Sequence, residues 1–142
     1  MGRLLQGGIW DGYVYDIAVN GDDVYVGGDF DRIDYWDDEW GMVQFAARNI
    51  ARWNPNDGWQ HVGHEDHSGV WGPSSTNSDC YGVDYVNALL VKSGHLYVGG
   101  FFYRATNTDH WGRQVDIGAH AGIRYDLTSG DWEKIVGTTS SS

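Results

Sequence analysis

The chain has 142 residues, with 21 Gly, 8 Trp and 9 Tyr but only 2 Pro, and its formal net charge is −11 at pH 7. This length predicts one domain, and the glycine-rich, aromatic composition favours strands joined by tight turns, so the expected fold class is all-β. An acidic chain without a Lys/Arg cluster is not expected to bind nucleic acid, and no apolar run approaches the ~18 residues of a membrane span, so no membrane insertion is expected.

The first predicted elements in chain order are strands. The segment LLQGG at 4–8 precedes IWDGYV and could be a strand of its own chain, or could add to the sheet edge of a neighbouring chain. Four strand-like pieces follow, each bounded by turn residues such as NGDD and NDG. They cover residues 14–19, 23–30, 49–54 and 59–63.

The chain then repeats itself at a shift of 72 positions. VYVGGDF at 24–30 returns as LYVGGFF at 96–102, which gives a first repeat at about 13–63 and a second at about 85–137 within a single unit 1–142. A recurring Gly-Gly pair inside a strand predicts a close approach by another backbone. Three polar, aromatic segments at 31–48, 64–84 and 103–120 are predicted to be inserted loops, where function would be carried.

The residues VYDIAVNGDDVYVGGDF, ARNIARWN and GWQHVG resemble the delta-60-type repeat of bacterial and fungal surface propellers. The resemblance implies a β-propeller with two four-stranded blades per chain, located extracellularly or at the cell surface. Because propellers generally need about four to eight blades, the ring would be completed by missing sequence or by oligomerisation. The implied partner is the chain itself, in a ring of three or four chains or in a fibre.

Two groups of residues could hold a metal ion. Clustered carboxylates are typical of a calcium site. The alternative interpretation is an acidic loop that is simply exposed to solvent. The calcium candidates are Asp34, Asp37, Asp38 and Glu39. Imidazoles spaced by three residues could bind a transition metal, but that spacing gathers side chains only on a helix, and adventitious nickel or zinc binding would look similar. These weaker candidates are His61, His64 and His67.

Aromatic residues of the predicted loops are the candidates for ligand binding. An exposed ring beside polar groups can serve as a platform for a sugar, although such rings also pack loops onto a sheet. The candidates are Tyr35, Trp36, Trp40, Trp71, Tyr81, Tyr103 and Trp111. Aromatics at repeated strand positions, by contrast, are predicted to be core, namely Trp53, Trp59, Tyr125 and Trp132. The recurring Arg52 and Arg124 are predicted to tie neighbouring strands or blades.

These observations favour a non-enzymatic binding module that holds glycans at several weak sites acting together. The alternative is a structural subunit of a self-assembling surface or fibre structure. A carbohydrate-active enzyme has the least support, because nothing fixes the separation of two carboxylates and neither a G-x-S-x-G nor an HExxH motif is present.

Overall fold

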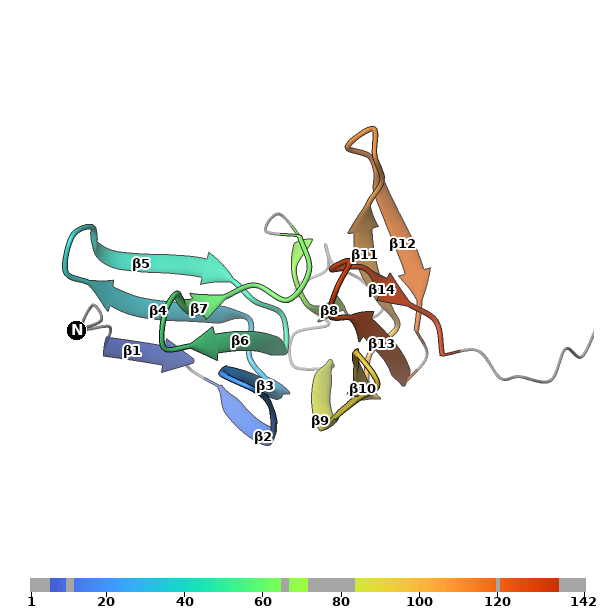
Figure 1. The fold of residues 1–142 in the computed structure, drawn as a ribbon, viewed down its shortest axis with the longest axis horizontal. Coiled ribbons are helices and arrows are strands. Elements are labelled where there is room, and N and C mark those ends of the chain that lie inside the picture. Colours follow the sequence, from blue (N-terminus) through green and yellow to red (C-terminus); the bar gives the residue numbers. More distant parts are fainter. Residues whose placement is uncertain (1–5, 10–11, 65–66, 72–83, 120, 136–142) are drawn as a thin grey trace, which may run out of the picture.

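The structure is a computed structural model that describes residues 6–9, 12–64, 67–71, 84–119 and 121–135 (Figure 1). The described residues form four antiparallel sheets of three or four strands, none of which is closed, so the all-β prediction is confirmed. The strands are β1 Gln6–Ile9, β2 Tyr13–Asn20, β3 Asp23–Asp29, β4 Arg32–Asp37, β5 Gly41–Ala46, β6 Ile50–Asn54, β7 Gly58–Gln60, β8 Val70–Trp71, β9 Tyr85–Lys92, β10 His95–Phe101, β11 Arg104–Thr108, β12 Gln114–Gly118, β13 Gly122–Asp126 and β14 Trp132–Glu133. Within these ranges no helix is long and apolar enough to cross a membrane.

The strands form two units with the same topology, which we call unit 1 (β1 to β7) and unit 2 (β8 to β14). Each unit has a four-stranded sheet, ordered β2-β3-β6-β7 in unit 1 and β9-β10-β13-β14 in unit 2. Each also has a three-stranded sheet, ordered β1-β4-β5 and β8-β11-β12. The duplication in the sequence is therefore also a duplication of structure, and the four predicted strand pieces of the first repeat correspond to β2, β3, β6 and β7.

The segments 31–48 and 103–120, expected as inserted loops, instead contain the hairpins β4–β5 and β11–β12. In β4 burial alternates along the strand, with Ile33 fully buried between half-buried neighbours. The acidic residues of this segment made the alternation hard to recognise in the sequence. The segment 64–84 contributes β8, and its residues 72–83 lie outside the described ranges. Of the predicted N-terminal strand, residues 4 and 5 lie outside the described ranges, and β1 (Gln6–Ile9) pairs with β4 of the same chain and so belongs to its own unit.

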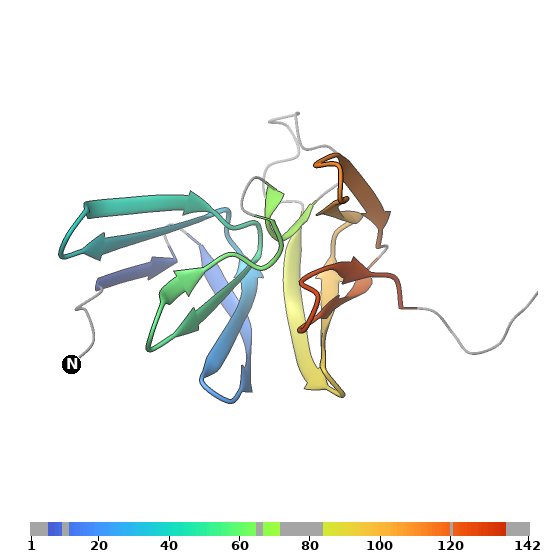
Figure 2. The same ribbon diagram turned by 45° about the horizontal axis from the view of Figure 1, so that its top comes forward.

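The larger core fills unit 2 and extends to the side of unit 1 that contacts it. Figures 1 and 2 show β2 and β3 beside β9, and these strands are in contact. Tyr25 of unit 1 is buried in one apolar cluster with Val86, Leu96 and Trp132 of unit 2. A second cluster around Ile33 fills unit 1 beneath its three-stranded sheet. The prediction that Trp132 is core is confirmed, and Trp53, Trp59 and Tyr125 are half-buried.

The second glycine of each recurring Gly-Gly pair lies where another backbone comes close, as predicted. A Cβ atom at Gly28 would collide with the carbonyl oxygen of Tyr13, and one at Gly100 would collide with that of Tyr85. A Cβ atom at Gly27 would strike Val86 of unit 2. Glycine is therefore required here by packing within each sheet and between the units.

Candidate functional site

The hairpin tip of unit 1 presents exposed rings on a structured turn. One carboxylate oxygen of Asp37, Oδ1, accepts hydrogen bonds from the backbone N–H groups of Glu39 at 2.8 Å and Trp40 at 3.0 Å. The Trp40 side chain is 73% exposed, and the cross-strand neighbours Trp36 and Met42 are exposed beside the turn. The buried Asp37 carboxylate thus fixes a turn that holds an apolar group out in solvent.

The hairpin tip of unit 2 repeats this arrangement with different partners. Oδ1 of Asp109 accepts the backbone N–H groups of Trp111 and Arg113, both at 2.9 Å, and the Trp111 side chain is 69% exposed. The Arg113 guanidinium lies 4.7 Å from the Trp111 ring centroid and donates from Nε to Asp109 Oδ2 at 2.9 Å. The hydrogen bonds from Arg113, first its backbone N–H, lower the pKa of Asp109. Each unit therefore carries one exposed tryptophan on an aspartate-anchored turn.

The two tips do not form one concave site. Figure 1 shows the β4–β5 and β11–β12 hairpins projecting at separate ends of the molecule. Of the other predicted ring residues, Tyr35 packs edge-on against Phe45 with centroids 6.3 Å apart, and the Arg48 guanidinium covers Trp71 at 3.9 Å. Tyr81 lies outside the described residues. The predicted ligand residues are therefore divided between the tips and packing positions.

A row of aromatic rings crosses from unit 1 to unit 2, and the sequence predicted only its last member, Tyr103. Neighbouring ring centroids lie 6.4 Å apart for Tyr13 and Tyr15, 6.1 Å for Tyr15 and Tyr85, 6.1 Å for Tyr85 and Phe101, and 5.6 Å for Phe101 and Tyr103. All but the half-buried Tyr85 are exposed. Tyr13 recurs in the sequence as Tyr85, but this recurrence predicted only a repeated strand and gave no indication of a row of rings.

The predicted calcium ligands have other roles in the structure. Asp34 forms an ion pair with Arg32 at 2.8 Å and accepts a hydrogen bond from the Gln44 amide at 3.4 Å. Asp37 anchors its turn, and Asp38 and Glu39 are exposed on that turn. The four carboxylates are not gathered into a shared set of ligand atoms among the described residues.

Of the three predicted histidine ligands, two lie together and the third, His61, packs elsewhere. His61 packs on Phe45 with ring centroids 4.3 Å apart, whereas His64 and His67 stack on each other at 4.8 Å. Nδ1 of His67 lies 3.3 Å from the Gln114 amide nitrogen, and its Nε2 lies 2.9 Å from the Thr108 hydroxyl. Both nitrogens of the buried His67 ring therefore have protein partners.

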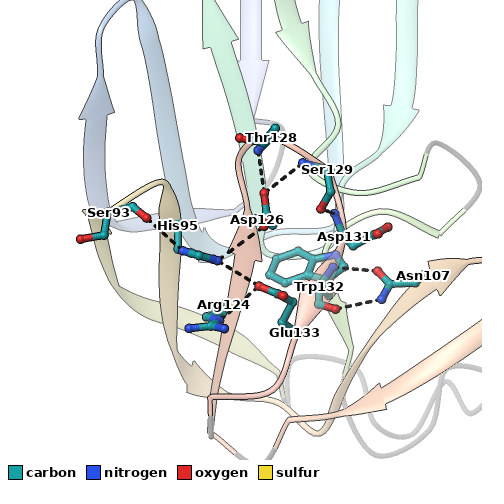
Figure 3. A network of polar contacts seen from close by, with 10 residues as sticks. All are labelled: Ser93, His95, Asn107, Arg124, Asp126, Thr128, Ser129, Asp131, Trp132 and Glu133. Atoms are coloured by element: carbon teal, nitrogen blue, oxygen red, sulfur yellow. Dashed lines mark hydrogen bonds and ion pairs between the residues drawn. The ribbon is translucent and has the colours of Figure 1, made fainter.

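A different group of potential metal ligands lies on the four-stranded sheet of unit 2 (Figure 3). Nε2 of His95 is 3.0 Å from Glu133 Oε1 and 3.6 Å from Asp126 Oδ2, while Nδ1 lies 3.2 Å from the Ser93 carbonyl oxygen. The three ligand atoms lie within 4.8 Å of one another, in half-buried side chains. One imidazole nitrogen and two carboxylate oxygens are a donor set that a transition metal accepts. No pattern in the sequence joins these residues, because β10, β13 and β14 bring them together.

The same positions in unit 1 carry a version of this network that has no imidazole and keeps a carboxylate, that of Asp23. The counterparts of His95 and Asp126 are Asp23 and Asn54, and the Asn54 amide donates to Asp23 Oδ1 at 3.2 Å. Oδ1 of Asn54 accepts two turn N–H groups, and so does Oδ1 of Asp126. In unit 2 these bonds, first the one from Ser129, lower the pKa of Asp126. The network is thus a structural feature of both repeats, and its imidazole is special to unit 2.

Both recurring arginines join neighbouring strands, as predicted. Nη2 of Arg52 donates to the Gln60 amide oxygen, and Nε of Arg124 donates to Glu133 Oε1 at 3.2 Å. These bonds connect β6 to β7 and β13 to β14. Because Arg124 already binds one of the three potential ligands, its positive charge opposes a cation at the His95 group.

A half-open pocket of about 280 Å³ lies between unit 2 and the connection from β7 to β8. The Tyr125 hydroxyl accepts the Gly63 N–H at 3.3 Å on its wall, and burial raises the pKa of Tyr125. The residues that line the pocket are Gly63, His64, Asn107, Thr108, Tyr125, Gly130 and Asp131. None of the predicted ring residues lines this pocket, so it is distinct from the hairpin tips.

Comparison with models of known families, with curated proteins and with solved structures gives no match to this chain. The functional interpretation therefore depends on the geometry of the hairpin tips and of the faces of the two units.

Proposed function

We propose that this chain is a propeller-type repeat module of the cell surface or extracellular space that binds glycans without catalysis. The observation that carries the proposal is the equivalent exposure of Trp40 and Trp111, one on each unit. Both rings stand in solvent on turns that an aspartate carboxylate anchors, and this recurrence in the two units favours a shared contact role over chance exposure. If the fold is a propeller, the two four-stranded sheets are its blades and the three-stranded sheets carry the binding tips.

The chemistry of the tips suits a sugar ligand. A tryptophan face packs against the C–H face of a pyranose, and neighbouring polar groups bind its hydroxyls. Arg113 beside Trp111 supplies donors, and the carboxylate of Glu39 beside Trp40 supplies acceptors. Each tip offers a small contact area, so the affinity of one site is low, and useful binding comes from several tips engaging one polymer.

The proposal is tested by removing the tip rings. We expect Trp40→Ala and Trp111→Ala each to weaken retention in affinity electrophoresis on cellulose-, chitin-, xylan- or mannan-type polysaccharides, and the double variant to abolish it. Tyr13→Ala is the matched control, because it removes an equally exposed ring that lies away from both tips. Unchanged retention of a folded double variant, or no retention of the unaltered chain on any polymer, would overturn glycan binding at the tips.

A second candidate function, a structural subunit of a self-assembling structure, is favoured by a different observation. Apolar side chains of the inner strands are exposed on both outer faces of the two-unit pair, with Ile17 and Val19 on one and Leu90 on the other. Neighbouring apolar side chains left exposed on a sheet face, such as Ile17 and Val19, favour contact with another chain.

A further inference from the structure

The contact between the two units has a defined pair of faces. On unit 1 it is formed by Ala18, Tyr25 and Arg52, which are cross-strand neighbours on β2, β3 and β6. Tyr25 is only 2% exposed, because unit 2 covers it, and the Arg52 side chain hydrogen-bonds to it. We call this surface the tyrosine face of unit 1.

Unit 2 covers the tyrosine face with an aliphatic surface. Leu89 and Val91 of β9 pack into the same apolar cluster as Tyr25, and Val86 fills the space over Gly27. One polar contact adds to the packing, since the Leu89 N–H donates to Asp16 Oδ2 at 2.7 Å. We call the surface formed by Val86, Leu89 and Val91 the aliphatic face of unit 2.

Unit 2 has a second copy of the tyrosine face, and it is partly open to solvent. Leu90, Tyr97 and Arg124 are cross-strand neighbours on β9, β10 and β13, at the positions that Ala18, Tyr25 and Arg52 hold in unit 1. The Arg124 side chain hydrogen-bonds to Tyr97, as Arg52 does to Tyr25. Leu90 is nevertheless 57% exposed and Tyr97 is half-buried, so among the described residues this face is partly open to solvent, whereas Tyr25 is 2% exposed.

Unit 1 has a second copy of the aliphatic face, and it is exposed. Val14, Ile17 and Val19 on β2 stand at the positions that Val86, Leu89 and Val91 hold on β9. All three are exposed, with Ile17 at 57% and Val19 at 62%. The chain therefore carries one complementary pair of faces that is joined and a second copy of the same pair that is separated.

We propose that a second copy of this chain docks head-to-tail, with the tyrosine face of unit 2 seated on the aliphatic face of unit 1 of the next copy. In this register Val14 of the next copy meets Gly99, just as Val86 meets Gly27 within the chain. Leu90 adds apolar area that Ala18 lacks at the internal contact. The hydrogen bond to Asp16 is not reproduced, because Ala88 stands at that position in unit 2, so the contact between copies is weaker than the internal one.

The contact is heterologous, since it joins two different faces. Each docked copy again exposes one free face at either end, so addition continues until the ring closes or a filament grows. The inference rests on the packing between the units and does not depend on glycan binding. The tip variants at Trp40 and Trp111 should therefore associate like the unaltered chain.

Two variants, each blocked on one face, test the docking. Leu90→Glu blocks only the tyrosine face of unit 2, and Val19→Glu blocks only the aliphatic face of unit 1. In sedimentation velocity we expect the unaltered chain to associate, each variant alone to sediment as a monomer, and their equimolar mixture to form a dimer that grows no further. Met42→Glu, which charges an exposed apolar residue on neither face, should associate like the unaltered chain.

The mixture is the decisive arm of this experiment. A mixture that stays monomeric, a variant that still associates alone, or an unaltered chain that is monomeric at all concentrations would overturn head-to-tail docking. Circular dichroism checks that each variant keeps its β-sheet spectrum. If a glutamate variant does not fold, the milder pair Leu90→Ser and Val19→Ser replaces it, with weaker association of each variant alone and recovery in the mixture as the expected results.

Discussion

Asn49 and Ala121 stand at the same point of the two units and share a left-handed backbone, with φ angles of 67° and 71°. The carbonyl oxygen of each accepts an N–H from the second glycine of the recurring pair, at 3.0 Å from Gly28 and 3.2 Å from Gly100. Asparagine tolerates this conformation, whereas alanine is strained in it. The two repeats thus share one left-handed backbone position, which asparagine adopts easily in unit 1 and alanine adopts with strain in unit 2.

Replacing Ala121 by glycine should stabilise the protein. Ala121→Gly removes a left-handed strain of ~1 kcal/mol, which exceeds the entropic cost of a glycine in the unfolded chain. We expect a higher melting temperature at a fixed protein concentration. Ala88→Gly, at an exposed strand position with ordinary φ, is the control and should lower it. A lower melting temperature for Ala121→Gly would mean that the Ala121 methyl group contributes more stability than its left-handed backbone conformation removes.

Replacing Asn49 by alanine should have the opposite and larger effect. The buried Asn49 side chain accepts the Phe30 N–H at 3.2 Å and donates to Asp84 Oδ2 at 2.8 Å and to the Val70 carbonyl at 3.3 Å. Asn49→Ala leaves these partners unsatisfied and strains the backbone, so we expect a loss of about 2–4 kcal/mol in urea unfolding. A loss below ~1 kcal/mol would show that water replaces the amide.

A side chain at Gly28 should disrupt the sheet of unit 1. Gly28→Ala forces a Cβ atom onto the Tyr13 carbonyl, and we expect a loss of ~1–3 kcal/mol or more in the free energy of unfolding. Gly118→Ala is the matched control, because a Cβ there meets open space and its φ is not left-handed. Equal effects of the two substitutions in thermal denaturation would contradict the close approach.

Asp29 should make stability depend on pH in an unusual direction. Burial, followed by the neighbouring carboxylates of Asp84 and Asp31, raises the pKa of Asp29. A carboxyl group whose folded pKa is raised stabilises the fold fully below its unfolded pKa, and this contribution is lost as the pH rises through the folded pKa. Asp29→Asn should therefore raise the melting temperature at pH 7 and change it little near pH 3, whereas the exposed control Asp38→Asn should show no such gain. An equal change at both pH values would rule out the titration.

The sequence predicted the parts of the fold that repeat and missed those that depend on contacts between distant strands. The shift of 72 positions located β2, β3, β6 and β7 and their counterparts, because alternating apolar residues and Asn, Asp and Gly turns are local signals. The hairpin β4–β5 was taken for a loop because Asp34 and Asp37 stand in its strands. Their partners, in an ion pair and in a turn, lie only two or three positions away in the chain, but the pairing of β4 with β1 and β5 that makes it a strand appears only on folding.

The candidate sites show the same division. The exposed tryptophans of the tips were among the predicted residues, since rings in polar segments are visible in the sequence. The row from Tyr13 to Tyr103 and the group around His95 were not, because each joins residues from strands that meet only through register and through the packing of one unit on the other. Periodicity within one segment carries no information about such pairings.

The most direct test of the central claim, that the two units carry complementary faces of which one pair is free, is the native mass of the unaltered chain. Multi-angle light scattering over a concentration series from low micromolar upward should give masses that rise in whole multiples of 15.9 kDa, or a single closed multiple. A mass of 15.9 kDa at every concentration, with an intact β-sheet spectrum, would contradict the account.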